Sequence, residues 1–389
     1  MPHPSSAASS PGTPVASPPA ATPVPSGPPR RIAIQFEPWF GEEEKQELAR
    51  VIDSGWVTEA QATREFEERF RTFVGATYAV ATTSGTIALT LALMAVGVDA
   101  GDEVLVPDMT FAGTATAVRL AGAVPVLVDV DPRTLGMDPL CAEAAITSRT
   151  RAIVPVHFNG RPADVRALGA LAASRGLHLV EDAAQALGSR AHGRQLGTFG
   201  ICGCFSLSTP KVITTGQGGM VTTEDPAVAA RLVELKDQGR IRRSQNHHPV
   251  LGFNFKFTDL QAAVGIAQMR KLPSRLARVA EMYERYRERL IHLGLEMLDV
   301  PRPDVQPWHV DVLTDRRDEL AAFLTSRQIG WRAYHPALHT QPPFASDAAY
   351  PIATRAANRG LWLPSSSFLT DAEIDEVIDA IADFAAGRA

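Results

Sequence analysis

The sequence predicts an α/β protein in which a large domain with a mostly parallel sheet precedes a smaller C-terminal α/β domain. From Tyr78 onward, short apolar strand candidates follow one another, and stretches with helical spacing of apolar residues separate most of them. Strands that are apolar throughout are typical of a parallel sheet covered by helices on both faces. The length of 389 residues exceeds what one compact core usually holds, which favours two domains.

The elements of the large domain follow in order along the chain. Helical spacing predicts two helices first, at Glu42–Trp56 and Ala62–Gly75. The strand candidates are Tyr78–Thr82, Glu103–Pro107, Val124–Val130, Ala152–His157, Leu177–Asp182, Gly203–Leu207 and Gly219–Thr223. The helical stretches between them are Thr86–Gly97, Ala112–Ala121, Pro139–Ile146 and Pro162–Gly176. Ligands of such sheets bind beyond the carboxyl ends of the strands, so functional residues are expected there.

The pattern changes after Phe257. A long helical region is expected at Thr258–Leu290, broken or kinked near Pro273. A strand at Trp308–Leu313, a helix at Asp318–Gln328, a strand at Arg359–Pro364 and a helix at Asp371–Phe384 follow. We therefore divide the chain into a large domain over residues 32–270 and a small domain over residues 271–389. Residues 1–31, rich in Pro, Ala and Ser, lack the side chains that form a core and are expected to be a disordered tail.

Composition excludes several classes of function. The net charge of −5 and the absence of a basic block argue against a nucleic-acid partner. The longest apolar run is too short to span a bilayer, so no membrane association is expected. The three cysteines, Cys141, Cys202 and Cys204, suit a reducing compartment and a cytoplasmic location, and no ligand cluster suggests a metal site.

Three features at strand ends carry chemical information. Ser84, Gly85 and Thr86 open a helix directly after a strand, where backbone N–H groups and the helix dipole favour an anion such as phosphate; an ordinary N-cap is the alternative. Asp182 ends an apolar strand and needs a cation or a hydrogen-bond donor, which a protonated ring nitrogen would supply; a structural aspartate is the alternative. Lys211 precedes a glycine-rich turn, and a desolvated lysine can become a nucleophile toward carbonyls, although a lone lysine is usually a solvated surface residue.

The combination and order of these features suit pyridoxal 5′-phosphate. This cofactor has a phosphate to anchor, a ring nitrogen to keep protonated, and an aldehyde that reacts with an amine.

Several ordered motifs resemble one family over nearly the whole chain beyond the tail. They are SGT at 84–86, GDEVLVPDMTF at 101–111, VPVHFNGRPAD at 154–164, VEDAAQALG at 180–188, FSLSTPK at 205–211, TTGQGGMVTT at 214–223 and LGFNFKFTDLQAA at 251–263. In this order and spacing the chain resembles the DegT/DnrJ/EryC1/StrS family of sugar aminotransferases. The resemblance implies an aspartate-aminotransferase-like large domain of pyridoxal-phosphate fold type I.

The resemblance also implies roles for residues that match the motifs. Lys211 would form the Schiff base with the cofactor and then shuttle a proton. Asp182 would pair with the pyridine nitrogen, Gln185 would lie near the ring hydroxyl, and Phe111 would stack on the ring. The cofactor phosphate would be bound by Gly85, Thr86, the backbone at Ile87 and Ser206, together with Asn254 of the neighbouring subunit in a homodimer with shared active sites.

The implied substrates are L-glutamate and a nucleotide-linked keto sugar, with pyridoxamine 5′-phosphate as the intermediate form of the cofactor. The segment Gly330–Phe344 most resembles the perosamine-synthase branch, which implies a GDP-linked 4-keto-6-deoxy sugar and a role in polysaccharide or antibiotic biosynthesis. Arg332 would pair with the diphosphate, and His335 and His339 would contact the sugar; surface or loop packing is the alternative for all three.

Two departures from the family pattern concern the substrate. Ser208-Thr209-Pro210 stands where His or Asn is common, a variant also found in enzymes acting on eight-carbon sugars, so a GDP-octose is an open alternative. Gln217 stands where Glu is usual. A non-catalytic cofactor-binding regulator and a sugar dehydratase or epimerase are the alternative functions. The presence of Lys211 argues against the family's dehydratases, in which a histidine replaces it.

Overall fold

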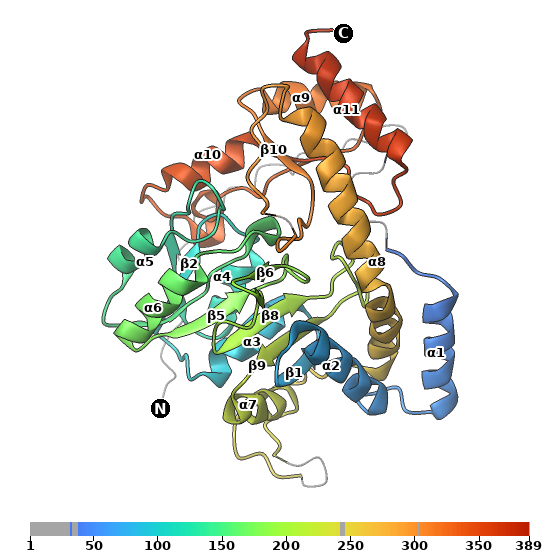
Figure 1. Ribbon diagram of the computed structural model, residues 1–389. Helices are drawn as coiled ribbons and strands as arrows, with labels where there is room; N and C mark the ends of the chain where they lie inside the picture. Colours follow the sequence, from blue (N-terminus) through green and yellow to red (C-terminus); the bar gives the residue numbers. More distant parts are fainter. Residues whose placement is uncertain (1–31, 33–37, 242–245, 302, 389) are drawn as a thin grey trace, which may run out of the picture.

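The computed structural model describes residue 32 and residues 38–241, 246–301 and 303–388 (Figure 1). The expected disordered tail, residues 1–31, lies outside the described residues. A large sheet with helices on both faces forms most of the molecule, and the C-terminal part of the chain adds a smaller α/β unit beside it (Figure 1). The predicted fold class, α/β with a mostly parallel central sheet, is confirmed.

The central sheet has seven strands, in the order β1-β9-β8-β5-β4-β2-β3. Their bounds are β1 Tyr78–Thr82, β2 Glu103–Pro107, β3 Val124–Val128, β4 Thr150–Ile153, β5 His178–Asp182, β8 Cys202–Ser206 and β9 Gly219–Thr223. Strand β9 is antiparallel to both of its neighbours, β1 and β8, and the remaining pairs are parallel. All seven strands agree with the sequence-based prediction to within a few residues, because each is an apolar run buried between two helical layers. A hairpin of β6 Arg190–Ala191 and β7 Arg194–Gln195 and the 3-10 turn η1 Phe158–Gly160 lie outside this sheet.

Alternate strand residues face two helical layers. The helices on one face are α3 Gly85–Ala95, α4 Gly113–Leu120 and α7 Pro226–Lys236. Those on the other face are α2 Gln61–Val74, α5 Pro139–Ala145, α6 Val165–Arg175 and the first half of α8 Asp259–Leu290, on which α1 Glu42–Ser54 packs. In β2, Val104 and Val106 pack toward α3 and α4, whereas Leu105 packs toward α5 and α6. Both faces of the sheet are therefore buried.

The smaller unit has its own core. Its antiparallel sheet, in the order β10-β12-β11, consists of β10 Asp311–Leu313, β12 Gly360–Trp362 and β11 Arg332–Ala333. The helices are α9 Arg317–Ser326, α10 Pro351–Arg359 and α11 Asp371–Ala385, and the 3-10 turns are η2 Leu338–Thr340 and η3 Pro342–Phe344. The core of this unit also includes residues of α8 from Val279 onward and Ile32, which forms a bridge with Ile329. The domain boundary near residue 270 stays a prediction.

Helix α8 tests one part of the expectation for Pro273. The helix is continuous through this residue, so the expected break is absent, whereas a kink there stays a prediction. The helix packs on α1 and α2 at one end and on α11 at the other. This tertiary packing along the whole helix outweighs the hydrogen bond that proline cannot donate.

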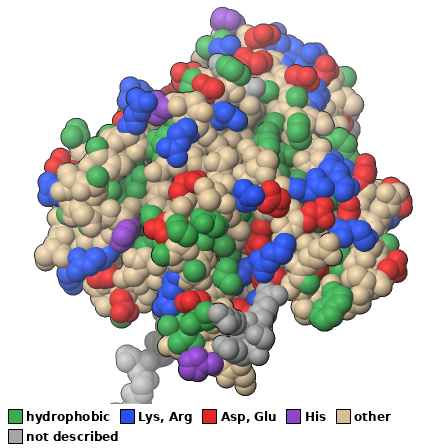
Figure 2. Space-filling view, turned by 60° about the horizontal axis from the view of Figure 1, so that its bottom comes forward, with side chains coloured by type: hydrophobic (Ala, Val, Ile, Leu, Met, Phe, Trp, Pro, Cys, Tyr) green, Lys and Arg blue, Asp and Glu red, His purple; other side chains and the backbone are tan. Residues whose placement is uncertain are grey.

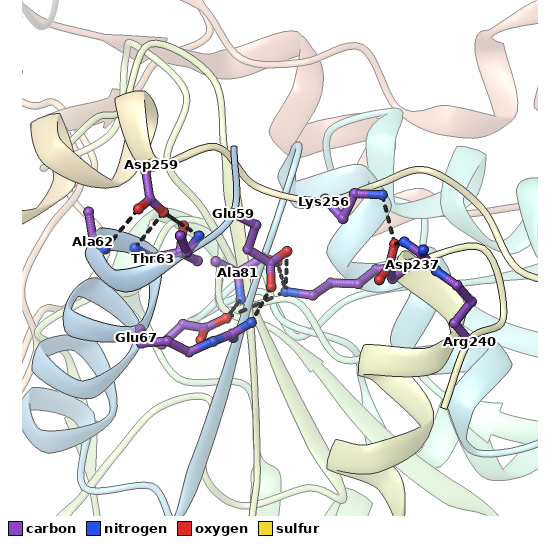
Figure 3. Close-up of polar contacts among 12 residues, drawn as sticks. Glu59, Ala62, Thr63, Glu67, Ala81, Asp237, Arg240, Lys256 and Asp259 are labelled. Carbon is purple, nitrogen blue, oxygen red and sulfur yellow. Dashed lines mark hydrogen bonds and ion pairs between the residues drawn. The ribbon is translucent and has the colours of Figure 1, made fainter. Parts of the chain in front are cut away.

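A buried polar network holds the end of strand β1, as the close-up in Figure 3 shows. The Lys236 ammonium donates to the carbonyl of Ala81 at 2.9 Å and lies 3.2 Å from Glu59 Oε2. Glu67 Oε1 accepts from the N–H of Ala81 at 2.8 Å. Nearby, Asp259 accepts backbone hydrogen bonds at the start of α2 (Figure 3). The network fixes the strand directly before the turn that opens α3.

The surface carries charges of both signs. Figure 2 shows one face on which acidic and basic side chains are interspersed and hydrophobic side chains gather between them. Within the described segments, no helix combines the length and apolarity needed to cross a membrane. The same segments contain no cluster of three His, Cys, Asp or Glu side chains placed to bind a metal ion.

Candidate active site

A cavity of about 320 Å³ lies where the carboxyl ends of β5 and β8 meet the first turns of α3 and α4. Its walls include Ser84, Gly85, Thr86, Phe111, Thr114, Asp182, Gln185, Ser206, Ser208, Lys211, Trp308, Arg332 and His335. The last three come from the C-terminal half of the chain. The cavity lies at the position that the strand-end rule predicts, and its volume is within the range of small-molecule sites.

Lys211 follows strand β8 and is half-buried in the wall of this cavity. Its Nζ lies 3.9 Å from the centre of the Trp308 ring. Burial lowers the pKa of Lys211 to about 8; the negative charge of Asp182 opposes this shift, and the positive charge of Arg332 adds to it. A lysine with this pKa is partly neutral near pH 8, so it can act as a nucleophile toward an aldehyde.

Asp182 is the last residue of β5 and is buried at the bottom of the cavity. Its Oδ2 accepts a hydrogen bond from Thr114 Oγ1 at 2.8 Å, and its Oδ1 accepts one from the N–H of Ala184 at 3.1 Å. Burial raises the pKa of Asp182 against these hydrogen bonds. A cation placed beside the carboxylate would reverse this effect, so the geometry suits a protonated ring nitrogen.

Glu181, one residue earlier on β5, faces away from the cavity. Its carboxylate lies 3.0 Å from His157 Nε2 and accepts hydrogen bonds from the backbone N–H groups of Gly197, Phe199 and Gly200. Strand alternation therefore leaves Asp182 as the acidic residue of β5 that faces the cavity.

The first turn of α3 lies against the end of β8, an arrangement that suits an anion. Ser84 caps the helix, because its Oγ accepts from the N–H of Ile87 at 3.2 Å. The N-cap expected as the alternative for this motif is thus present, and it leaves other first-turn N–H groups for an anion. Gly85 lies against Ser206: a Cβ at position 85 would be only 2.8 Å from Ser206 Cβ. Ser206 Oγ lies 3.2 Å from Ser208 Oγ, and both residues line the cavity.

Gln185 and Phe111 both line the cavity, Gln185 buried and Phe111 exposed. The Oε1 atom of Gln185 accepts from the N–H of Asn159 at 2.7 Å, which orients the Gln185 side chain so that its NH₂ group remains for a ligand. Phe111 is 56% exposed, and its ring centre lies 5.3 Å from that of His335. An exposed aromatic ring at a cavity mouth can cover a planar ligand.

Two of the three expected substrate residues line the cavity. Arg332 and His335 are both in its wall, and burial together with the charges of Arg332 and Lys211 lowers the pKa of His335 to about 3. His339 is held elsewhere: its Nδ1 lies 2.6 Å from Asp108 Oδ2, and its N–H donates to Asp108 Oδ1 at 2.7 Å. His339 therefore does not reach the cavity within this chain.

Asn254 and Ile87 also lie outside the cavity lining. Asn254 is exposed and forms a backbone bridge with Asp237 on the loop that precedes α8. An exposed position is compatible with the expected contact to a neighbouring subunit. The roles of both residues stay predictions.

Comparisons with known proteins agree with this geometry. The sequence model of the DegT/DnrJ/EryC1/StrS aminotransferase family matches residues 38–382. The chain belongs to this family. Among its relatives, the GDP-perosamine synthase of Caulobacter vibrioides is 37% identical over 351 residues, which cover 87% of this chain and 94% of the relative.

Solved structures of the family share the fold. DesV of S. venezuelae, determined in complex with a ketimine intermediate, is 37% identical with a TM-score of 0.84, over 88% of this chain and 94% of DesV. DesI, determined in the presence of its TDP-sugar product, is 33% identical with a TM-score of 0.86, over 92% of this chain and 93% of DesI. The family consists of pyridoxal-phosphate-dependent aminotransferases, and the prediction of such an enzyme is confirmed.

The residues of the cavity fit pyridoxal phosphate. The cavity combines an amine of lowered pKa, a buried carboxylate and an anion-binding helix start within one space. Gly113 keeps this space open, because a Cβ there would lie 3.0 Å from both Phe111 Cδ1 and Thr86 Oγ1. Lys211, Asp182 and the first turn of α3 would hold the aldehyde, ring-nitrogen and phosphate ends of the cofactor.

Sequence reasoning missed three residues of the site. Thr114 on α4 donates to Asp182, Ser208 pairs with Ser206, and Trp308 lies against Lys211. Thr114 lies three residues after Phe111, the last residue of the motif at 101–111, and this proximity is its only local signal. Trp308 lies 97 positions beyond Lys211 in a strand-like segment, and a fold was needed to bring the two together.

Proposed function

We propose that this aminotransferase moves an amino group from L-glutamate to the keto group of a nucleotide-linked sugar. The convergence of Lys211 and Asp182 in one cavity beside the α3 anion site carries the proposal. When bound, pyridoxal phosphate supplies the aldehyde that reacts with amines and a ring that accepts electrons, and pyridoxamine phosphate carries the amino group between the half-reactions.

Each residue of the cavity has its own role in this proposal. With the cofactor bound, neutral Lys211 Nζ would be the nucleophile toward its aldehyde, and the same nitrogen would hold and move a proton during amino transfer. The Asp182 carboxylate, oriented by Thr114, would keep the ring nitrogen protonated. The first turn of α3 and Ser206 would bind the phosphate, and the amide of Gln185 would donate to the ring oxygen.

A GDP-linked 4-keto-6-deoxy sugar is the favoured acceptor, and a GDP-octose the second. The likeness to the C. vibrioides GDP-perosamine synthase supports the first. Arg332 would pair with the diphosphate, since its guanidinium lies in the cavity wall, and neutral His335 would contact the sugar. His339 is engaged by Asp108, so we assign it a structural role instead of the expected sugar contact.

The site is completed by a second copy of the chain in this proposal. Asn254 is exposed on the loop before α8, from where it would reach the neighbouring phosphate. Large apolar side chains are exposed on α1, on the loop that follows it and on the segment near Asn254: Ile52 (60%), Trp56 (70%), Val57 (41%) and Leu251 (81%). Exposed apolar side chains of this size suit such a contact. The cytoplasmic location stays a prediction.

The experiment follows the colour of the bound cofactor. Protein loaded with pyridoxal phosphate should lose its yellow absorbance when L-glutamate is added and regain it with a GDP-linked 4-keto-6-deoxy sugar. Borohydride reduction followed by peptide mass spectrometry should place the cofactor on Lys211, and Lys211→Ala should take up none covalently. A yellow protein that no amino donor bleaches would indicate a regulator instead. A product that has lost water instead of gaining an amino group would indicate a dehydratase.

A further inference from the structure

Trp308 contacts Lys211 and the residue before it, although it comes from the C-terminal half of the chain. The Lys211 ammonium lies 3.9 Å from the centre of the indole ring, within the range of a cation–π interaction. The indole Nε1–H donates to the carbonyl of Pro210 at 2.8 Å, so the same side chain also holds the peptide directly before the lysine. One residue thus restrains both the backbone and the tip of Lys211.

Trp308 is itself held rigidly. Its backbone N–H donates to the carbonyl of Asn159 at 3.3 Å, and its side chain is 7% exposed. The indole packs edge-on against Trp362, with ring centres 5.8 Å apart, and against His309 at 4.2 Å. A ring fixed on several sides can serve as a platform for a flexible side chain.

The charged and titratable groups around Lys211 do not hold it in place by themselves. Asp182 attracts the ammonium, whereas Arg332 repels it, and burial keeps His309 and His335 neutral by lowering their pKa values. An ammonium drawn to Asp182 would compete with a ring nitrogen for the same carboxylate. The indole face gives the amine a different resting place in the cavity wall.

We propose that Trp308 is a positioning residue that holds the Lys211 amine whenever the lysine is not bonded to the cofactor. The amine then waits beside the cavity, ready to attack the aldehyde carbon or to take up and return a proton. The attack forms a C–N bond from the nitrogen lone pair, and the carbonyl oxygen leaves as water after proton transfer. This inference rests on the proposed function for the cofactor, but the contact between Trp308 and Lys211 can be tested without it.

The test compares three variants. Trp308→Leu removes the aromatic face and the N–H donor, and Trp308→Phe keeps a face but removes the donor. Trp39→Leu is the matched control, because Trp39 lies under another lysine, Lys271, at 5.6 Å. Cofactor-free protein is labelled with acetic anhydride across a pH series, and peptide mass spectrometry gives the labelling midpoint of Lys211. Stopped-flow absorbance then measures covalent capture of pyridoxal phosphate at a pH where the lysine is neutral in every variant.

We expect the labelling midpoint of Lys211 to fall by roughly one pH unit in Trp308→Leu and by less in Trp308→Phe, because each weakens the attraction for the ammonium. Capture above the midpoint should slow by about tenfold in Trp308→Leu, since a misplaced amine stays misplaced when neutral. Trp39→Leu should change neither value. Unchanged midpoint and capture rate in folded Trp308→Leu would overturn the inference, and if that variant does not fold, the same result in Trp308→Phe would do so. A wild type that never captures the cofactor refutes the proposed function, while the labelling midpoint still tests the contact.

Discussion

The lowered pKa of Lys211 leads to a prediction in which two substitutions act in opposite directions. Burial and Arg332 disfavour the ammonium, and Asp182 favours it. Arg332→Gln should therefore raise the pKa of Lys211, and Asp182→Asn should lower it, each by roughly one unit for a charge at close range.

The size of the effect follows from the value of about 8. At pH 7.5 roughly a quarter of Lys211 amines would be neutral, against roughly one in a thousand for a lysine of ordinary pKa. The neutral, reactive form is thus about two hundred times more abundant for Lys211 than for a lysine of ordinary pKa. Raising the pKa by one unit would reduce that quarter to roughly 3%.

The assay is the acetylation of cofactor-free protein across a pH series, with Lys211 quantified by peptide mass spectrometry. An exposed lysine such as Lys45 serves as the internal reference. Wild-type Lys211 should show a midpoint near 8, and the two variants should move it to opposite sides. A wild-type midpoint near the ordinary lysine value of 10.5, or a shift of both variants in one direction, would refute the electrostatic account.

The same pKa affects stability with a definite sign. The folded-state pKa lies below the unfolded value of 10.5, so between pH 8 and 10.5 the unfolded chain binds more protons at this position. The contribution of Lys211 to the free energy of unfolding therefore rises with pH through this window. Lys211→Met, which cannot titrate, should flatten that part of the pH profile in chemical denaturation.

Three further predictions concern other parts of the molecule. Gly85→Ala places a Cβ 2.8 Å from a neighbouring side chain and should weaken cofactor binding in equilibrium titrations, whereas Gly169→Ala, whose Cβ would have 3.9 Å of clearance in helix α6, should not. Asp311 is buried and pairs with Arg161 at 2.8 Å, so Arg161→Met would leave its carboxylate buried without a cation. This substitution should reduce the free energy of unfolding by about 3–5 kcal/mol in urea titrations. Asp259→Ala removes the acceptor of several backbone N–H groups at the start of α2 and should cost about 1–2 kcal/mol in the same assay; a loss below about 0.3 kcal/mol would contradict the capping role.

The fold was predictable because its signals are local. Each strand of the central sheet is an apolar run, and each helix between strands shows its own apolar periodicity, so strand positions followed from the sequence. The short β11, Arg332–Ala333, escaped prediction because two residues carry no periodic signal. No break forms at Pro273, because the local preference of proline competes with packing along the whole of α8. The sequence also could not show that Ile32 joins the C-terminal core.

The site was predictable only in the part that strand ends define. Asp182 ends its strand, the turn at Ser84 closely follows another, and Lys211 ends a recognisable motif, so position in the chain implied position in space. Trp308 had no such signal, since its contact with Lys211 depends on how two distant segments pack. His339 had no such signal either: the sequence suggested a sugar contact, whereas its ring contacts Asp108 and is not part of the cavity lining, and its role stays a prediction.

The C-terminal half is part of the active site because strand-end carboxylates of the large sheet bind it there. Asp108, which follows β2, accepts from the backbone and ring of His339, and Asp129, which follows β3, accepts from the first N–H groups of α10, including that of Ala353 at 2.9 Å. Both carboxylates bind the stretch of chain that follows His335, so that ring is brought against the cavity by contacts at the sheet edge. Acidic side chains at the ends of strands in this sheet thus have two roles. Asp182 faces the cavity, whereas Asp108 and Asp129 bind the C-terminal segment that forms part of its wall. A chain that ended near residue 270 would keep Lys211 and Asp182. It would lose Trp308 and the part of the cavity wall that buries Lys211 and lowers its pKa. The reactivity of Lys211 therefore depends on both parts of the chain.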